Sequence, residues 1–511
     1  MKRIFAQAFA AWLLLPLGQS HALAADNSPA GRYEVTLHAH AFEALDVTAH
    51  ITRTSGRIFP GVGGGSYLKG GWTSVIENLA VRTPDGRPVQ RTLKYLAEYG
   101  AHYWALTLDG KPYSGPIDLR YRVNLGYAKK KHPYGNEQGG QAFARSLYTV
   151  AKPVFVASDI EGAWRVHFDL PAGMRVAYPL KHADASSAEF VAPDFSALQD
   201  NPITIGKFFQ QSIAAGAATL DLVLPHVGDG DPQAVLQTAR KVMTLYGRLL
   251  PGGRAGRYQV VMFPSYADDG ESYTNATVVT SSQPFSAKNR LVWTDLLAHE
   301  LFHFWNGVRL ASASAEETQW FSEGFTEYYA VLAQVNLGLI GPDVFEKHLE
   351  QNYANYRYFL HSGLYKDASL QSAGMAKARN RFGVYNGGFV VALSLDMAIH
   401  ERTGGRKSLD DVMQSLFANF ALKERHFTPA DIVKAVSAVA GTDYTTFFEA
   451  HVDGRMPIDA ESLFSPLGFN ASTVAFAGEA YLERKPHPSR AERANWRWLT
   501  KTRFRRTSGG G

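Results

Sequence analysis

The sequence contains no cysteine among its 511 residues. Disulfide bonds and thiolate metal sites are therefore excluded, and any metal ion must be held by His, Asp or Glu. Charged residues make up only 19% of the chain, against 45% apolar residues. This balance excludes a disordered chain and is typical of a soluble globular protein. A chain of this length needs more than one hydrophobic core, so we expect two to four domains.

Long hydrophobic runs are also missing, apart from one at the N-terminus. Lys2 and Arg3 precede the apolar run "FAQAFAAWLLLPLG", and a small-residue "ALA" follows at residues 22–24. This order predicts a signal peptide over residues 1–24 that is cleaved on export to the periplasm or beyond. The alternative is an uncleaved anchor helix, although the run is short for a membrane span. The absence of cysteine excludes a lipid anchor, and we expect no transmembrane segment in the mature chain.

The net charge of +5 is unevenly distributed. Nine Lys or Arg residues lie between residues 484 and 506, opposed only by Glu492. We interpret residues 471–511 as a solvated basic tail. The alternative is a contact with an anionic surface or a nucleic acid. That contact would weaken steeply with salt, and truncation after residue 483 would remove it without an effect on catalysis.

The chain changes character along its length. Residues 31–227 predict a β domain, because stretches such as "RYEVTLHAH" alternate apolar and polar residues and Asp-Gly turns separate them. Residues 228–400 are mixed, and residues 401–470 carry helix-capping patterns such as "SLDDVM" and "TPADIV". The sequence therefore predicts an α+β multidomain protein. His38 and His40 share one face of a predicted strand, where we interpret them as surface residues rather than metal ligands.

The stretch "LLAHELFHFWNGVRL", residues 296–310, carries the chemistry. On a helix, His299 and His303 lie four residues apart on one face and can bind the same metal ion. Glu300 can reach a water molecule on that metal and take its proton. Zinc lowers the pKa of such a water to about 7. The alternative for this pattern alone is a core helix with two buried histidines, so a third ligand decides between the two.

Glu323 supplies the expected third ligand. It lies nineteen intervening residues after His303 in the apolar stretch "TQWFSEGFTEYYAVL", where a buried carboxylate needs a partner. One helical turn later, Glu327 can accept a hydrogen bond from the outer N–H of a ligating histidine. The alternative interpretation of Glu327 is a solvated carboxylate. Two His and one Glu with one open position predict a catalytic site for one Zn²⁺ ion, although cobalt or manganese would also bind.

These motifs resemble the glycyl aminopeptidase family of gluzincin metallopeptidases, which is related to the membrane-alanyl aminopeptidases. "HELFHFWN" and "WFSEGFTEYYA" match its ligand and base positions. "FPGVGGGSYLKGGWTSVIENLAV", "VYNGGFVVALSLDMAIHERTGGRKSLDDVM" and "FFEAHVDGRMPIDAESLFSPLGF" extend the similarity over most of residues 31–469. The resemblance implies a β-sandwich-like N-terminal domain, a thermolysin-like catalytic domain over residues 228–400 and a C-terminal helical domain over residues 401–470.

The resemblance also implies two further site residues. Tyr385 matches the tyrosine that stabilises the oxyanion, a role for which a phenol donor is suited, and Gly387 stands where relatives often have Lys. Glu271, in "DDGESYTNATVV", is the candidate for the carboxylate that holds the free amine of the substrate, although the family motif is altered there. The PDZ-like domain of many family members has no counterpart after residue 470.

Three hypotheses follow. The first is an exported zinc aminopeptidase that acts on peptides with a small N-terminal residue such as Gly or Ala. The second, within the same class of enzymes, is an endopeptidase. The third is a catalytically silent peptide-binding protein, which would have no reason to keep Glu300.

Overall fold

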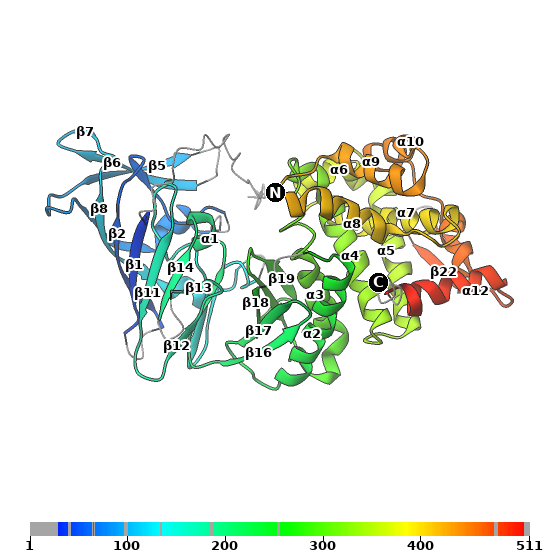
Figure 1. Cartoon of the computed structure of the whole chain (residues 1–511), viewed down its shortest axis with the longest axis horizontal. Coiled ribbons are helices and arrows are strands. Elements are labelled where there is room, and N and C mark those ends of the chain that lie inside the picture. Colours follow the sequence, from blue (N-terminus) through cyan, green and yellow to red (C-terminus); the bar gives the residue numbers. More distant parts are fainter. Residues whose placement is uncertain are drawn as a thin grey trace, which may run out of the picture. The chain divides into compact units, whose positions relative to one another are not determined.

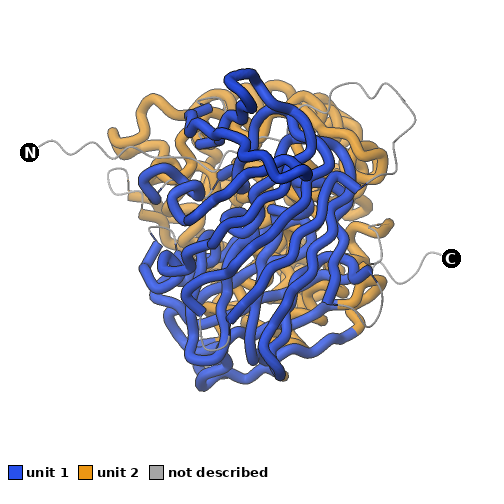
Figure 2. Tube along the Cα trace, turned by 90° about the vertical axis from the view of Figure 1, so that its left-hand side faces the viewer, with its two compact units in different colours: residues 1–213, 220–232, 257–289 blue, residues 214–219, 233–256, 290–511 orange. Residues whose placement is uncertain are grey.

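The computed structural model describes residues 29–504, except for 39–41, 64, 66, 97–100, 133–134, 184–187, 253–255 and 475–478. The predicted signal peptide and His40 lie outside the described residues. The chain forms two compact units (Figure 2): unit 1 comprises residues 1–213, 220–232 and 257–289, and unit 2 comprises residues 214–219, 233–256 and 290–511. This division differs from the predicted boundaries. Residues 257–289 group with the β-rich unit, and residues 401–470 do not separate from the catalytic segment.

Unit 1 is built from β-sheets, as predicted (Figure 1). The largest sheet has seven strands in the order β13-β14-β11-β1-β2-β8-β4. The alternation seen in the sequence places Tyr33 and Val35 in the core and Arg32 and Glu34 in solvent. The strands are β1 (Gly31–Thr36), β2 (Ala44–Ile51), β4 (Ile76–Arg82), β8 (Ile117–Asn124), β11 (Trp164–Asp169), β13 (Lys181–His182) and β14 (Glu189–Ala192).

Three further sheets complete unit 1. One has the order β3-β6-β5 with β7 on β6, the second β12-β15-β10-β9 and the third β16-β17-β18-β20-β19. Their strands are β3 (Arg57–Ile58), β5 (Gln90–Leu96), β6 (Ala101–Leu108), β7 (Lys111–Pro112), β9 (Gly140–Ala142), β10 (Ser146–Val150), β12 (Arg175–Ala177), β15 (Pro202–Gly206), β16 (Phe209–Ala215), β17 (Ala218–Leu224), β18 (Arg257–Pro264), β19 (Asp269–Ser272) and β20 (Ala276–Ser281). A short helix, α1 (Phe195–Gln199), precedes β15.

A cross-strand ion pair joins two strands of the large sheet. Asp46 on β2 lies opposite Arg122 on β8 and accepts hydrogen bonds from its Nε at 2.7 Å and its Nη2 at 3.0 Å. These bonds to the guanidinium are the main reason why the pKa of Asp46 falls to about 2. The carboxylate therefore favours the folded state at neutral pH.

Unit 2 is helical, with one two-stranded sheet (Figure 1). Eight consecutive residues of α4, from Tyr328 to Val335, are buried, so this helix lies in the core of the unit. Its elements are α2 (Pro232–Leu249), α3 (Arg290–His303), α4 (Gln319–Asn336), α5 (Pro342–His361), α6 (Leu370–Ala373), α7 (Gly388–Arg402), α8 (Leu409–Asn419), α9 (Pro429–Ala440), α10 (Thr445–Phe448), α11 (Ala460–Phe464), β21 (Phe469–Thr473), β22 (Ala480–Arg484) and α12 (Arg490–Arg497).

Helices α4 and α7 cross with their backbones in contact. A Cβ atom on Gly388 would lie 1.9 Å from the carbonyl oxygen of Trp320, and one on Gly324 would lie 2.3 Å from the Cα of Gly388. No side chain larger than hydrogen fits at either position, so the two glycines set the distance between the helices. Gly324 directly follows Glu323, and Gly388 lies three residues after Tyr385.

The prediction of a solvated basic tail is wrong for the part of it that the structure describes. Residues 480–502 form β22, α12 and a π-helical turn, Trp498–Thr502. Arg503 is buried and bonds to two carboxylates, Asp396 on α7 and Asp410 on α8. Since both partners belong to the packed helices of unit 2, this segment is part of the fold, and a truncation after residue 483 would leave Asp396 and Asp410 without Arg503.

One hydrophobic run was missed in the sequence. The helical segment Phe382–Arg402 is long and apolar enough to cross a membrane by length and composition alone. However, 72% of its most apolar window is buried inside the structure, which is the pattern of a core helix.

Candidate metal centre

The three predicted ligands converge in unit 2. His299 and His303 lie on α3, and Glu323 lies on α4. The two Nε2 atoms of the histidines are 3.1 Å apart, and Glu323 Oε2 lies 3.3 Å from His299 Nε2 and 3.2 Å from His303 Nε2. Two imidazole nitrogens and one carboxylate oxygen that face one point are the donor set of a catalytic zinc site.

The outer nitrogens of both histidines have acceptors. His303 Nδ1 donates to the backbone carbonyl of Asn306 at 2.9 Å. His299 Nδ1 lies 3.0 Å from Glu327 Oε2, the contact expected from the sequence. A ring that donates from Nδ1 keeps the lone pair of Nε2 for a metal, so these bonds orient the rings and select the tautomer that binds. The residues present therefore fit a zinc ion.

Burial and neighbouring charges shift the pKa values of the ligand side chains. Burial lowers the pKa of His299, but hydrogen bonds to Glu323 and Glu327 outweigh it and bring the pKa to about 10. Burial raises the pKa of Glu323, but the ammonium of Lys377 and both histidines hold it well below its usual range. A metal cation would displace the proton on His299, so metal binding releases protons here.

Lys377 is a site residue that the sequence analysis missed. It lies just after the short turn Gly374–Ala376, and its Nζ donates to Glu323 Oε1 at 2.7 Å. Glu323 Oε1 is thereby turned away from the histidines, and only Oε2 faces them. The same ammonium lies 5.3 Å from the centre of the Tyr385 ring. No periodicity or motif in the sequence marks this lysine, because its partners come from other elements.

Tyr385 lies beside the ligands on a π-helical segment, Phe382–Gly387. Its ring centre is 5.9 Å from that of His299, with an angle of 30° between the planes. Burial and then the negative charge of Glu323 raise the pKa of the phenol, against the opposing effect of Lys377. The hydroxyl therefore keeps its proton at neutral pH and can donate a hydrogen bond.

Glu300 is 7% exposed and lies on α3 between the two histidine ligands in sequence. Buried carboxylates need partners or a nearby cation, and the metal centre offers one. Trp293, Leu297, Leu301 and Phe302 of α3 are all buried. Their packing anchors the helix that carries two of the ligands.

Glu271 lies in unit 1, on β19, apart in sequence from the ligands. Its Oε2 accepts from Gln138 Nε2 at 2.7 Å. Nearby, Glu137 is fully buried, and its pKa is raised by burial and by the negative charges of Asp269 and Glu271. Glu271 therefore belongs to an acidic group within unit 1, while the other six predicted site residues lie in unit 2.

Comparison with protein families agrees with the ligand geometry. A model described as M61 glycyl aminopeptidase matches residues 292–381, and one described as the peptidase M61 N-terminal domain matches residues 32–207. The chain belongs to the M61 glycyl aminopeptidase family. The M61 match includes the ligands and Glu300, and the centre is therefore of the zinc metallopeptidase type.

Similar solved structures support the α+β fold of this M61 chain. An aminopeptidase N family protein from Idiomarina loihiensis has a TM-score of 0.73 at 18% identity, with 86% of this chain and 79% of that chain covered. The M1 zinc metallopeptidase from Deinococcus radiodurans has a TM-score of 0.52 at 15% identity, with 84% of this chain and 94% of that chain covered. The expected β-sheet region followed by a helical catalytic region is confirmed.

One curated relative is similar in sequence. Over 225 residues, or 39% of this chain, the M61 protein is 26% identical to leucine aminopeptidase 2 of Phaeosphaeria nodorum. The match spans only 33% of that relative's length.

Proposed function

We propose that the protein is an exported zinc aminopeptidase that removes a small N-terminal residue, Gly or Ala, from peptides. The observation that carries this proposal is the meeting of His299 Nε2, His303 Nε2 and Glu323 Oε2 within 3.3 Å of one another, with Glu300 on the same helix. A zinc ion bound there supplies Lewis-acid chemistry and makes water acidic enough to ionise near neutral pH.

The residues of the chain then have distinct tasks. Glu300 takes a proton from the attacking water and returns it to the leaving amine. Tyr385, protonated at neutral pH, donates a hydrogen bond to the oxygen of the scissile carbonyl as negative charge develops on it. Glu327 and Lys377 hold His299 and Glu323 in place.

Glu271 is the proposed partner of the substrate's free amine. Its support is the acidic group it forms with Asp269 and Glu137: the negative charges of Glu271 and Asp269 raise the pKa of Glu137, and an ammonium ion would offset those charges. If no free amine is needed, the alternatives are an endopeptidase of the same type or a catalytically silent peptide-binding protein.

Two peptides separate these alternatives. One begins with a free Ala, and the other has the same sequence with that amine acetylated; both are incubated with the zinc-loaded protein. We expect trimming of the free peptide alone, and no trimming by Glu300→Gln, which keeps the shape of the side chain but not its basicity. Cleavage of both peptides would identify an endopeptidase, and cleavage of neither would favour a binding protein.

Export is tested separately. The full chain is expressed in a bacterial host, and its N-terminus is sequenced from the periplasmic fraction. A start just after residue 24 is expected, and retention of residues 1–24 on protein from the cytoplasm would contradict export.

A further inference from the structure

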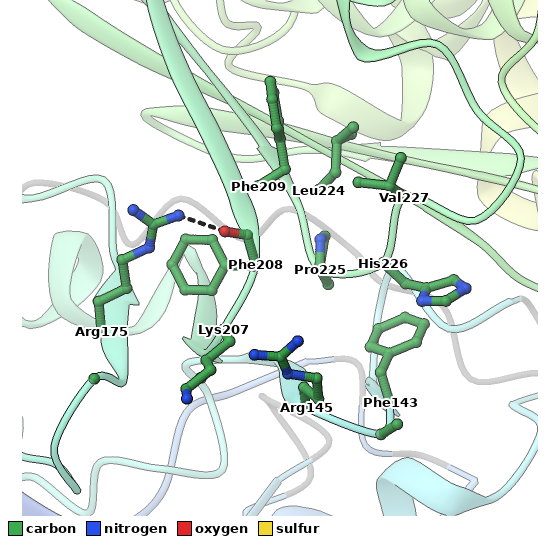
Figure 3. Close-up of a pocket in the computed structure, with 13 residues that line it drawn as sticks. Phe143, Arg145, Arg175, Lys207, Phe208, Phe209, Leu224, Pro225, His226 and Val227 are labelled. Atoms are coloured by element: carbon green, nitrogen blue, oxygen red, sulfur yellow. Dashed lines mark hydrogen bonds between the residues drawn. The ribbon is translucent and has the colours of Figure 1, made fainter.

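A pocket in unit 1 is lined by several basic side chains (Figure 3). Its volume is about 580 Å³, within the range of sites that hold small molecules. Arg145, Arg175, Lys207 and His226 line it together with Phe143 and Phe208. Among the described residues that line the pocket, none is an Asp or a Glu.

The register of one sheet brings the three cations together. Gly206, the last residue of β15, lies opposite both Ser146 of β10 and Arg175 of β12. Lys207 follows it, and its backbone N–H donates to the carbonyl oxygen of Arg145 at 2.8 Å. Arg145, Arg175 and Lys207 therefore lie at the same end of three neighbouring strands, β10, β12 and β15.

The last residue of β15 must be a glycine. Gly206 has a φ of 119°, and a Cβ atom there would lie 2.4 Å from the carbonyl oxygen of Arg145. A side chain at this position would separate β15 from β10. Gly206 therefore allows the close approach of the strand ends that carry Arg145 and Lys207.

The cations of the pocket differ from other cations of unit 1 in their ion pairing. Five other arginines of unit 1 form ion pairs, namely Arg57, Arg87, Arg122, Arg165 and Arg257. Arg145, Arg175 and Lys207, in contrast, form none with any residue that the structure describes. Arg175 is instead fixed by a hydrogen bond to the carbonyl oxygen of Phe208, and its guanidinium lies 4.6 Å from the centre of that ring.

Aromatic rings form another part of the wall. Phe143 and His226 are stacked, with ring centres 5.6 Å apart and planes 10° from parallel. Figure 3 shows Arg145 between this pair and Phe208. The pocket thus offers two guanidinium groups and one ammonium to an oxyanion and flat apolar surfaces to the rest of a ligand.

From this arrangement we infer that unit 1 binds a small organic anion, with a phosphate or two carboxylates on a flat apolar body, in the pocket formed by Arg145, Arg175 and Lys207. This site is independent of the proposed peptidase activity. Phosphate and carboxylate share the chemistry that the guanidinium groups recognise, so the test distinguishes the two sources.

Calorimetric titration of the full chain is the test, with phenyl phosphate, phthalate, inorganic phosphate and benzyl alcohol as probes. We expect phenyl phosphate or phthalate to bind more tightly than inorganic phosphate, and benzyl alcohol to bind weakest. The double variant Arg145→Gln/Lys207→Gln, whose side chains are exposed, should lose at least about tenfold in affinity, the effect of one charge-assisted hydrogen bond.

The matched control is Arg91→Gln/Lys94→Gln on β5, which removes the same charge from exposed positions of unit 1. This control should bind the probes as tightly as the wild type does. Binding of a probe at the metal centre of unit 2 should be the same in the wild type and both double variants. Preference for phenyl phosphate identifies a phosphate ligand, and preference for phthalate identifies a dicarboxylate. The inference is overturned if neither anion binds at millimolar concentration, if benzyl alcohol binds as tightly, or if both double variants bind alike.

Discussion

Replacement of Arg503 by Met tests whether the C-terminal segment stabilises the helices that carry the site. The guanidinium is 1% exposed and bonds to Asp396, which is fully buried, and to Asp410. Without it, the buried carboxylate of Asp396 and the half-buried carboxylate of Asp410 lose their shared cation. Breaking such a pair costs about 3–5 kcal/mol. At about 2–4 °C per kcal/mol for a unit of this size, we expect the Tm of unit 2 to fall by about 6–20 °C.

Differential scanning calorimetry of the full chain measures this shift, because the two units can unfold in separate transitions. The control is Lys501→Met, which removes an exposed positive charge two residues away and should change the Tm by less than about 2 °C. Equal shifts for the two variants would refute the argument. Tyr328, which lies on α4 with the ligand Glu323, also donates to Asp396. We therefore expect zinc to be lost near the lowered Tm as well.

Three other predictions follow from contacts already described. Lys377→Met should weaken zinc binding by about 10–100-fold in a chelator competition, because Glu323 loses the ammonium that orients it; unchanged affinity would contradict this role. Gly388→Ala should lower both the Tm and the zinc content, since its Cβ atom meets a backbone oxygen at 1.9 Å, whereas Gly363→Ala, with no atom within 4 Å, should leave both unchanged. Wild type should be more stable than Asp46→Asn above about pH 5, and this difference should shrink as the pH falls below about 4 and vanish only below about pH 2, because folding lowers the pKa of this carboxyl from 3.8 to about 2; a Tm difference that does not shrink between about pH 5 and about pH 2 would exclude this explanation.

Much of the metal centre could be predicted because its signals are local. The four-residue spacing of His299 and His303 depends only on helix geometry, and Glu323 was recognisable as a carboxylate in an apolar helix. Lys377 could not be found in this way. Its role arises from the crossing of elements distant in sequence, and an isolated lysine in a polar stretch carries no pattern of its own.

The fold shows the same limit. Alternation along Gly31–Thr36 predicted a strand correctly, and Ser408 and Thr428 begin helices as their capping patterns indicated. In contrast, charge density alone led to the wrong prediction for Arg503. A run of basic residues does not reveal that one of them, Arg503, bonds to Asp396 and Asp410 inside the protein. Long-range pairing decides such cases, and composition does not contain it.

The π-helical segment that carries Tyr385 has a consequence for how the site could have arisen. Such a segment holds one residue more in its turn than an α-helix does. Loss of Asn386, which lies between Tyr385 and Gly387, would restore regular α-helix and rotate Tyr385 and every preceding side chain by about 100° relative to α7. The phenol would then leave the ligands although Gly388 and its crossing with α4 stayed in place. A one-residue change in length thus separates an architecture with an oxyanion donor from the same architecture without one.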